Sequence, residues 1–368
     1  MEIHDLPVAG YERVVRARDP ESGLHALVAI HDTTLGPSLG GMRMWPYASE
    51  SEAMTDVLRL ARGMTFKSAV AHTGLGGGKS VVIGDPKAVK SEKLFLAMGR
   101  VVDSLGGRYI TAEDVNIGID DLEIVRRSTR WVSGLAREDG GSGNPSPYTA
   151  YGVYLGIRAA CGRQFDNDEL RSRHVAVQGV GAVGSALVER LVKAGARVTV
   201  ADAREDRVRA LAEKLGVATA RVDEIVAVPC DVFAPCALGA VIDDRTIGTL
   251  RCKVIAGAAN NVLHEPRHGR QLFERGVLYA PDYVINAGGI INVSAEFAAG
   301  GYVEAEALRR IERIPEALRQ VWSISNDEKI PASDAADRLA MNIVAEAKAR
   351  PAATKAATAS PRPGHFAG

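Results

Sequence analysis

The sequence predicts an α/β protein with two domains and a cleft between them, and three observations support this prediction. The chain has 368 residues, more than a single hydrophobic core usually organises. Ala, Val, Leu, Ile and Gly dominate and aromatic residues make up only 5% of the chain, as suits buried parallel strands. Residues 141–147, Gly-Ser-Gly-Asn-Pro-Ser-Pro, form the clearest break in composition and indicate a hinge.

Composition excludes several classes of function. Lysine plus arginine balances aspartate plus glutamate, 45 against 45, so no electrostatic attraction to nucleic acid or to a membrane surface is expected. No apolar run reaches the length of a membrane span, and the first twenty residues lack the apolar core of a signal peptide. The four cysteines form no Cys-x-x-Cys pair, so we expect no metal site and a reduced, cytoplasmic setting.

The first elements of the chain are predicted to be strands. Residues 11–17 and 24–30 have β-type patterns, and the turn-forming segment 19–23 separates them. The glycine-rich stretch 35–43 that follows is either a plain loop or one wall of a pocket.

A helix is predicted to follow, and it leads to the first of two lysines. Ser49 and Glu52 form a capping box, and apolar residues continue at helical spacing as far as Met64. We expect Lys67 just past the end of this helix, in apolar surroundings. With Lys79 in the same cleft, burial and mutual repulsion would leave one lysine charged to anchor a carboxylate and the other able to act as a base.

Residues 74–80, Gly-Leu-Gly-Gly-Gly-Lys-Ser, are the most distinctive stretch of this half. Three consecutive glycines suggest that a ligand approaches the main chain closely, with Lys79 beside it. A phosphate-binding P-loop is the alternative, but Thr73 occupies the place of its first glycine. We therefore favour a substrate pocket with two lysines.

Two acidic residues mark the end of the next predicted strand. After a short strand at 80–83 and a helix at 91–105, the strand 107–115 ends near Glu113 and Asp114. Carboxylates at strand ends commonly face an active-site cleft, so we favour a functional role for Asp114 over a helix cap.

The second half carries a dinucleotide-binding fingerprint. Strand 174–178 runs directly into Gly179-Val180-Gly181-Ala182-Val183-Gly184, and a helix and a second strand at 197–200 follow, ending close to Asp202. Such glycines let the pyrophosphate approach a helix N-terminus, which predicts a Rossmann domain. Asp202 can accept hydrogen bonds from ribose hydroxyls and would repel a 2′-phosphate, which favours NAD over NADP, although Arg204 close by could accommodate that phosphate.

Further strands and two helical regions complete the prediction. Strands are expected at 231–237, 253–261, 276–281 and 283–290, and several end in small or amide residues that could meet a cofactor. Helices are expected at 304–322 and 333–350, with a break near 325–327, and residues 351–368 are expected to be disordered.

Six motifs, taken in order, resemble one family. They are residues 35–41, 64–67, 76–79, 111–115, 257–261 and 279–289. Over nearly its whole length before the tail, the chain resembles the amino-acid dehydrogenases that include the leucine, valine, phenylalanine and glutamate enzymes. The resemblance implies reversible, NAD-dependent oxidative deamination of an L-amino acid to a 2-oxo acid and ammonium, by a homo-oligomer.

The resemblance also implies roles for individual residues. Lys67 would pair with the substrate carboxylate, Lys79 would be the general base, Asp114 the proton carrier, and Asn261 would position the substrate and the nicotinamide. The side-chain pocket would be lined by Leu39, Gly40, Met64, Ala112, Ile290 and Val293. The cofactor would contact Gly179, Gly181, Ala182, Val183, Gly184, Asp202, Ala237, Ala258, Asn260 and Asn286.

Domain limits and substrate complete the expectation. We expect a substrate domain at 1–143, with helices from about 325–350 packing back onto it, and a dinucleotide-binding domain at 144–324. The pocket residues are apolar or small, which favours leucine or valine over glutamate. Asn116 stands where leucine-type enzymes usually have glycine, so a phenylalanine- or tryptophan-preferring enzyme is the alternative. A non-catalytic NAD-binding sensor is the alternative from another class.

Overall fold

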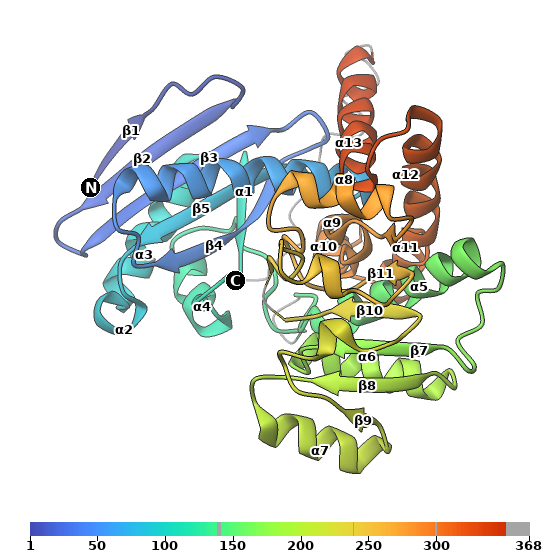
Figure 1. Cartoon of the computed structure of the whole chain (residues 1–368). Coiled ribbons are helices and arrows are strands. Elements are labelled where there is room, and N and C mark those ends of the chain that lie inside the picture. The colour runs from blue at the N-terminus through green and yellow to red at the C-terminus, as the bar shows by residue number, and fades with distance from the viewer. Residues whose placement is uncertain (138–140, 238, 299, 351–368) are drawn as a thin grey trace. The chain divides into compact units, whose positions relative to one another are not determined.

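The computed structural model describes residues 1–137, 141–237, 239–298 and 300–350. The chain forms two compact units (Figure 1). The first contains Met1–Asn144, Val293–Glu304 and the chain from Ala340 on, and the second contains Pro145–Asn292 and Ala305–Leu339. The domain ranges given above remain predictions, and the tail at 351–368 lies outside the described residues.

The first unit is built on a mixed six-stranded sheet in the order β1-β2-β3-β5-β4-β6. The strand β4 pairs in parallel with both β5 and β6, and the other pairs are antiparallel. The elements are β1 (Glu2–Asp5), β2 (Arg13–Asp19), β3 (Leu24–Asp32), β4 (Ser38–Trp45), α1 (Glu50–Val70), β5 (Gly76–Ile83), α2 (Pro86–Val89), α3 (Glu92–Ser104), β6 (Tyr109–Ala112) and α4 (Ile119–Arg126).

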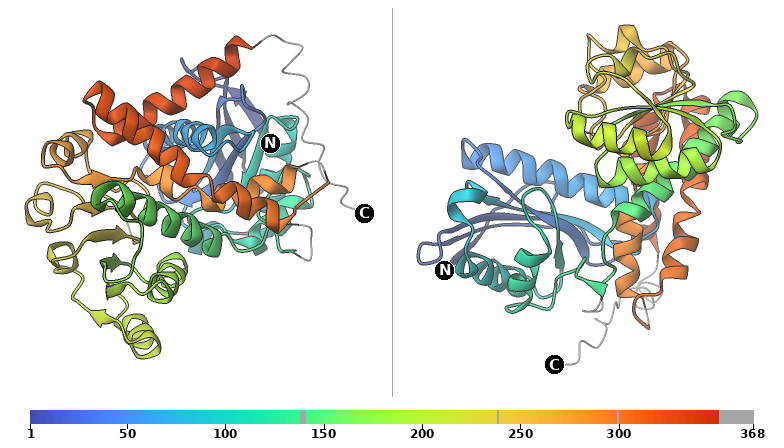
Figure 2. Two further views of the ribbon diagram at one scale, coloured as in Figure 1. Left: turned by 90° about the vertical axis from the view of Figure 1, so that its right-hand side faces the viewer. Right: turned by 90° about the horizontal axis from the view of Figure 1, so that it is seen from below.

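Helices cover this sheet on both faces because its strands are apolar on both faces. Alternate residues of a strand point to opposite sides, so Val81 joins a core cluster with Val57 of α1, while Val82 joins another with Val101 of α3. Figure 2 shows α1 on one side of the sheet and α3 and α4 on the other. Side chains of β5 that point to the same face as Val81 therefore lie under α1.

The three consecutive glycines have a structural explanation that corrects the sequence-based interpretation. They lie inside β5, and all three are buried by protein atoms. A Cβ on Gly77 would lie 2.0 Å from the backbone nitrogen of Thr65 in α1, and one on Gly76 would lie 2.2 Å from the carbonyl oxygen of Asp32. The glycines thus permit close packing of helix and strands, and this extended strand is no P-loop.

The second unit is a doubly wound α/β sheet, which confirms the predicted fold class. Its six parallel strands lie in the order β12-β11-β10-β7-β8-β9, with the switch of direction between β7 and β10. The remaining elements of the chain are α5 (Ser146–Phe165), β7 (His174–Gln178), α6 (Ala182–Lys193), β8 (Arg197–Ala201), α7 (Glu205–Leu215), β9 (Ala218–Thr219), β10 (Val232–Pro235), β11 (Val254–Ile255), α8 (Pro266–Glu274), β12 (Leu278–Tyr279), α9 (Asp282–Ile285), α10 (Gly288–Ser294), α11 (Glu304–Ile311), α12 (Ile314–Glu328) and α13 (Ala332–Ala349).

Two predicted segments in the first unit were assigned wrongly. The stretch 35–43 is a loop only at residues 35–37, since Ser38–Trp45 forms β4, where Gly40 lets the chain pass against the carbonyl of Gly78. Lys67 does not follow the helix but lies in its last turn, because buried Phe66, Ala69 and Val70 continue the apolar side of α1.

Two further corrections concern the later part of the chain. Residues 283–290 form parts of helices α9 and α10 rather than a strand. Short apolar runs fit a helix or a strand equally well, and Asp282 in the first turn of α9 favours the helix. The expected break at 325–327 is absent, and α12 continues until Lys329 adopts a left-handed conformation with φ of 55°.

None of the helices in the described ranges has the length and apolar character needed to cross a lipid bilayer.

We predict that Gly77→Ala will destabilise the protein because the new methyl group meets the backbone of α1. The free energy of unfolding should fall by about 2–3 kcal/mol, as for other overpacked cores. Gly63→Ala is the matched control, since a Cβ there meets nothing within 4 Å. At this exposed position of α1, alanine should stabilise the helix by up to about 1 kcal/mol. Denaturant unfolding of both variants measures the difference, and equal stabilities would contradict the packing argument.

Candidate functional site

Lys79 lies in the middle of the sheet of the first unit. It belongs to β5, and as a residue two positions before Val81 it points to the face covered by α1. Only 3% of the residue is exposed. A buried ammonium group needs a partner, and the structure provides one.

Asp114 is that partner, and a tight turn after β6 presents it. The amide of Ile117 donates to the carbonyl of Asp114 at 2.9 Å, and the amide of Val115 donates to Oδ1 of Asp114 at 2.7 Å. Asn116 has a left-handed φ of 62°, and its side-chain amide donates to the carbonyl of Met44 at 3.0 Å. In this arrangement, Nζ of Lys79 forms an ion pair with Oδ2 of Asp114.

Sequence reasoning missed Arg43, which is a second cation on the same carboxylate. Nε of Arg43 donates to Oδ1 of Asp114 at 2.9 Å, and Nη1 donates to Oδ2 of Asp56 at 2.9 Å. The hydroxyl of Tyr47 donates to the same oxygen of Asp56 at 2.7 Å. The available signal was the strand period, because Arg43 lies between buried Met42 and Met44 and so must point to the α1 face of the sheet.

The electrostatics of this cluster are dominated by burial and by the two cations. Burial lowers the pKa of Lys79, and the Asp114 carboxylate opposes that shift. Burial acts to raise the pKa of Asp114, but the charges of Lys79 and Arg43 outweigh it and lower that pKa to about 2. Asp114 is therefore ionised at neutral pH, and Lys79 is the group of the pair that binds the proton.

The other predicted substrate residues are distributed over several elements. Lys67 is half-buried in the last turn of α1, the helix that covers the Lys79 face. Leu39 is buried in β4 next to Gly40, whereas Met64 and Ala112 are partly exposed. Ile290 and Val293 are buried one turn apart in α10. The roles of these residues stay predictions.

The glycine fingerprint of the second unit fits a dinucleotide. Gly179 has a φ of +95°, and a Cβ on Gly184 would lie 1.9 Å from the carbonyl oxygen of Gly179, so both glycines are required by the protein itself. A Cβ on Gly181 would meet nothing within 4 Å. Open space at this glycine, directly before Ala182 and Val183 in the first turn of α6, is what close approach of a pyrophosphate requires.

Asp202 ties the end of β8 to this loop. One carboxylate oxygen accepts from the amide of Val180 at 2.7 Å, and the other accepts from the amide of Arg204 at 2.8 Å. The guanidinium of Arg204 is turned to Asp206, with contacts of 3.0 and 2.8 Å. Arg204 is thus engaged by a carboxylate.

The predicted amide residues form a local network between the segment after β11 and the C-terminal end of α9. Asn286 is 3% exposed, and its side chain donates to the carbonyl of Ala258 at 3.0 Å and to Oδ1 of Asn260 at 2.7 Å. Asn261 has a left-handed φ of 50°, and its carbonyl accepts from the amide of Ala240 at 2.6 Å. Asn286 therefore supports the loop that presents Asn260 and Asn261, and exposed Ala237 follows β10 nearby in the sequence.

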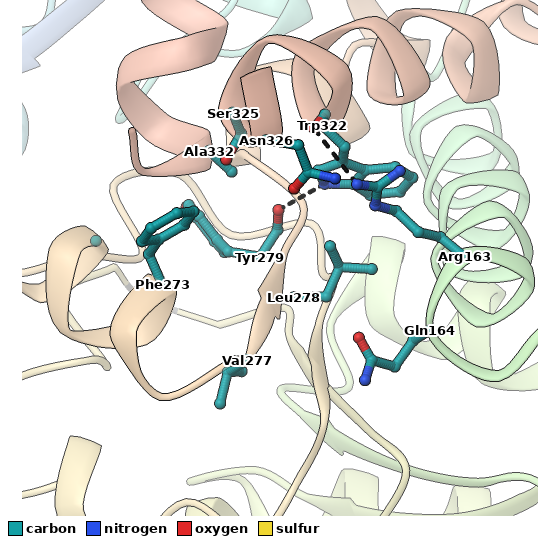
Figure 3. A pocket seen from close by; sticks show the side chains of 12 residues that line it. Arg163, Gln164, Phe273, Val277, Leu278, Tyr279, Trp322, Ser325, Asn326 and Ala332 are labelled. Atoms are coloured by element: carbon teal, nitrogen blue, oxygen red, sulfur yellow. Dashed lines mark hydrogen bonds between the residues drawn. The ribbon is translucent and has the colours of Figure 1, made fainter. Parts of the chain in front are cut away.

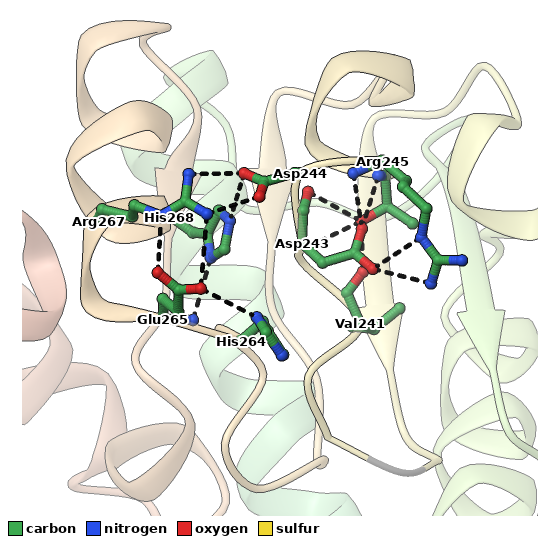
Figure 4. A network of polar contacts seen from close by, with 9 residues as sticks. Val241, Asp243, Asp244, Arg245, His264, Glu265, Arg267 and His268 are labelled. Carbon is green, nitrogen blue, oxygen red and sulfur yellow. Dashed lines mark hydrogen bonds and ion pairs between the residues drawn. The ribbon is translucent and has the colours of Figure 1, made fainter.

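A cluster of charged side chains connects the segment after β10 to the start of α8 (Figure 4). Arg267 donates to both oxygens of Asp244 at 2.6 Å and to Glu265 at 2.7 Å. The buried ring of His268 contacts Asp244 through Nε2 at 3.2 Å and accepts from the amide of Glu265 through Nδ1 at 3.0 Å. These contacts hold together the two chain segments that the Ala240–Asn261 hydrogen bond also joins.

A cavity of about 340 Å³ also lies in the second unit, between α5, α8, β12 and α12. The guanidinium of Arg163 lies 5.8 Å from the centre of the Trp322 ring, and Asn326, Leu278 and Phe273 also line the cavity (Figure 3). The indole nitrogen of Trp322 donates to the carbonyl of Tyr279 at 2.9 Å. None of the residues lining this cavity is among the predicted site residues.

Two family models match the chain. Residues 11–131 match the model described as Glu/Leu/Phe/Val dehydrogenase, dimerisation domain. Residues 140–205 and 199–351 match the model described as glutamate/leucine/phenylalanine/valine dehydrogenase.

Curated relatives and solved structures agree with these matches. The chain is 51% identical to a leucine dehydrogenase from Thermoactinomyces intermedius, over 92% of this chain and 93% of the relative. It is 47% identical to a valine dehydrogenase from Streptomyces coelicolor, over 93% and 94% of the two chains. A crystal structure of L-tryptophan dehydrogenase from Nostoc punctiforme matches with a TM-score of 0.82 at 39% identity, over 92% of this chain and 97% of that one.

These matches cover both units and all the motifs that predicted the resemblance. The chain belongs to the glutamate/leucine/phenylalanine/valine dehydrogenase family, whose members are amino-acid oxidoreductases.

Proposed function

We propose that the protein catalyses NAD-dependent oxidative deamination of an apolar L-amino acid. In the reaction, the amino acid, water and NAD⁺ give the 2-oxo acid, ammonium, NADH and a proton. The observation that carries the proposal is the buried ion pair of Lys79 and Asp114 in a chain of this family. A lysine whose pKa is lowered by burial can act as a base near neutral pH.

The residues of the first unit would bind and activate the substrate. Lys67 would pair with the α-carboxylate, and Lys79 would take a proton from the water that attacks the imino acid. Asp114 would exchange protons with the amine and the carbinolamine. NAD, when bound, supplies the acceptor for the hydride that leaves the α-carbon. Asn261 would position the substrate and the nicotinamide.

The choice of NAD over NADP is part of the proposal. Asp202 follows β8 and Asp206 lies in the first turn of α7, and Arg204, the cation that could have bound a 2′-phosphate, pairs with Asp206. A phosphate entering here would meet negative charge and would have to displace that ion pair. Both features favour a ribose with a free 2′-hydroxyl.

The preferred substrate side chain is proposed to be leucine- or valine-like. Leu39, Ile290 and Val293 are apolar and buried, and relatives at 51% and 47% identity are a leucine and a valine dehydrogenase. The tryptophan dehydrogenase at 39% identity keeps an aromatic substrate as the second candidate. The matched model is described as a dimerisation domain, which supports a homo-oligomer, and the four free cysteines fit a cytoplasmic enzyme.

A substrate panel tests the activity directly. We expect purified protein to form NADH with L-leucine, L-valine or L-isoleucine, with a kcat/KM at least about tenfold above that for L-glutamate, because a buried carboxylate without a cation costs several kcal/mol. Absorbance at the NADH band with NAD and with NADP measures both preferences. Absence of turnover with every apolar amino acid would refute the proposed function.

We predict that Lys79→Met will abolish turnover while NAD still binds. The methionine side chain preserves apolar packing but removes the base, and kcat should fall by about 10³-fold. NAD affinity, measured by calorimetry, should change less than about twofold because the fingerprint lies in the other unit. Lys93→Met on the exposed side of α3 is the matched control. Loss of NAD binding in Lys79→Met would contradict the assigned role.

We predict that Gly181→Ala will weaken NAD binding without destabilising the protein. The added methyl group meets no protein atom but occupies the space proposed for the pyrophosphate, so the dissociation constant should rise at least about tenfold. Gly184→Ala is the contrasting variant, because its methyl group would collide with the carbonyl of Gly179 and should lower the melting temperature. Unchanged NAD affinity in Gly181→Ala would remove the support drawn from this loop.

A further inference from the structure

We propose that Arg43 is a positioning residue of the reaction: held by Asp56, it binds one oxygen of the Asp114 carboxylate while Lys79 binds the other, and its charge favours the neutral, basic form of Lys79. This inference rests on the proposed function, and it concerns a side chain to which that proposal gives no role.

The geometry gives each oxygen of Asp114 its own cation. Oδ1 accepts from Nε of Arg43 at 2.9 Å and from the amide of Val115 at 2.7 Å, whereas Oδ2 is paired with Lys79. Donors on both oxygens favour the ionised form of the carboxylate. Among these donors, Lys79 is the one whose pKa burial lowers, whereas guanidinium and amide groups keep their protons.

Asp56 fixes the position of Arg43 from the opposite side. Its Oδ2 accepts from Nη1 of Arg43 at 2.9 Å and from the hydroxyl of Tyr47 at 2.7 Å. Its Oδ1 accepts from Nη2 of Arg59 at 3.1 Å. The side chains of Arg43 and Asp56 are 21% and 15% exposed, so solvent screens their charges only in part. Arg59, at 61% exposed, contributes much less.

The charged groups that act on Lys79 are Asp114 after β6, Arg43 from β4 and Asp56 from α1. The elements packed against β5 also carry Arg59 and Lys67 in α1, Tyr47 between β4 and α1, and Glu113 after β6. Burial lowers the pKa of Lys79, the charge of Arg43 lowers it further, and Asp56 raises it. Opposite changes at Arg43 and Asp56 should therefore move the titration of Lys79 in opposite directions.

The pH profile of kcat/KM provides the test. A base must be unprotonated to act, so the rate rises with pH as Lys79 loses its proton. In Arg43→Gln the pKa of Lys79 rises, and the rising limb should shift to higher pH by roughly one unit. In Asp56→Asn, which is nearly isosteric, the pKa of Lys79 falls, and the limb should shift to lower pH.

Two control variants separate charge from packing and from the contact with Asp56. Arg43→Lys retains the cation, so the rising limb of its pH profile should stay within about 0.3 pH units of the wild-type position, even where kcat falls. A shift of about 0.3 pH units corresponds to a free-energy change of only about 0.4 kcal/mol. Arg59→Gln removes an exposed cation that touches Asp56 but not Asp114, and it should leave the profile unchanged. NAD affinity, measured for all variants, should stay constant.

The outcomes are decisive in both directions. Three results would overturn the inference while leaving the proposed function intact. They are unshifted profiles in Arg43→Gln and Asp56→Asn, shifts of the same sign in these two variants, or a shift in Arg43→Lys as large as that in Arg43→Gln. Absence of turnover in the wild-type enzyme would instead refute the proposed function. If Arg43→Gln does not fold, the direction of the shift in Asp56→Asn decides alone.

Discussion

The burial of Lys79 is the constraint on which the first unit depends. Removing an ammonium group from water costs several kcal/mol of hydration free energy, and an anion placed against it offsets that cost. Asp114 supplies that anion, and Arg43 and the amide of Val115 complete the contacts of its carboxylate. A core with apolar residues at these positions would be simpler to stabilise, and the proposed function gives a reason for keeping the charges.

The cluster can form only because the backbone elements approach one another very closely. Gly77 brings β5 against α1 at Thr65, and Gly41 leaves room for the carbonyl of Glu113 and the Cβ of Asp114. Side chains at either position would push apart the elements that carry Lys79, Arg43 and Asp114. The glycines therefore set the spacing of the charged groups, and contact with a ligand is not needed to explain them.

Local signals in the sequence were sufficient for part of this structure. The Gly179–Gly184 fingerprint was predicted because its strand, glycines and helix are adjacent in the chain. Lys79 is predicted because it follows three consecutive glycines, and Asp114 because it lies near the end of a predicted strand. Arg43 is not, since its partner Asp114 is 71 residues away and only the pairing of β4 with β6 brings them together. The strand β4 was itself missed, because glycines are typical of loops when their packing partners are unknown.

Asn116 shows how the fold changes the meaning of one residue. From the sequence, its presence after Val115 raised the question of an aromatic substrate. In the structure it has a φ of 62°, a conformation that asparagine and glycine adopt more readily than other residues. Its side chain donates to the carbonyl of Met44, within the first unit. Glycine at this position would satisfy the same backbone requirement, so the difference between the two residues concerns the turn that presents Asp114. The Asn116 side chain is thus accounted for by contacts within the first unit.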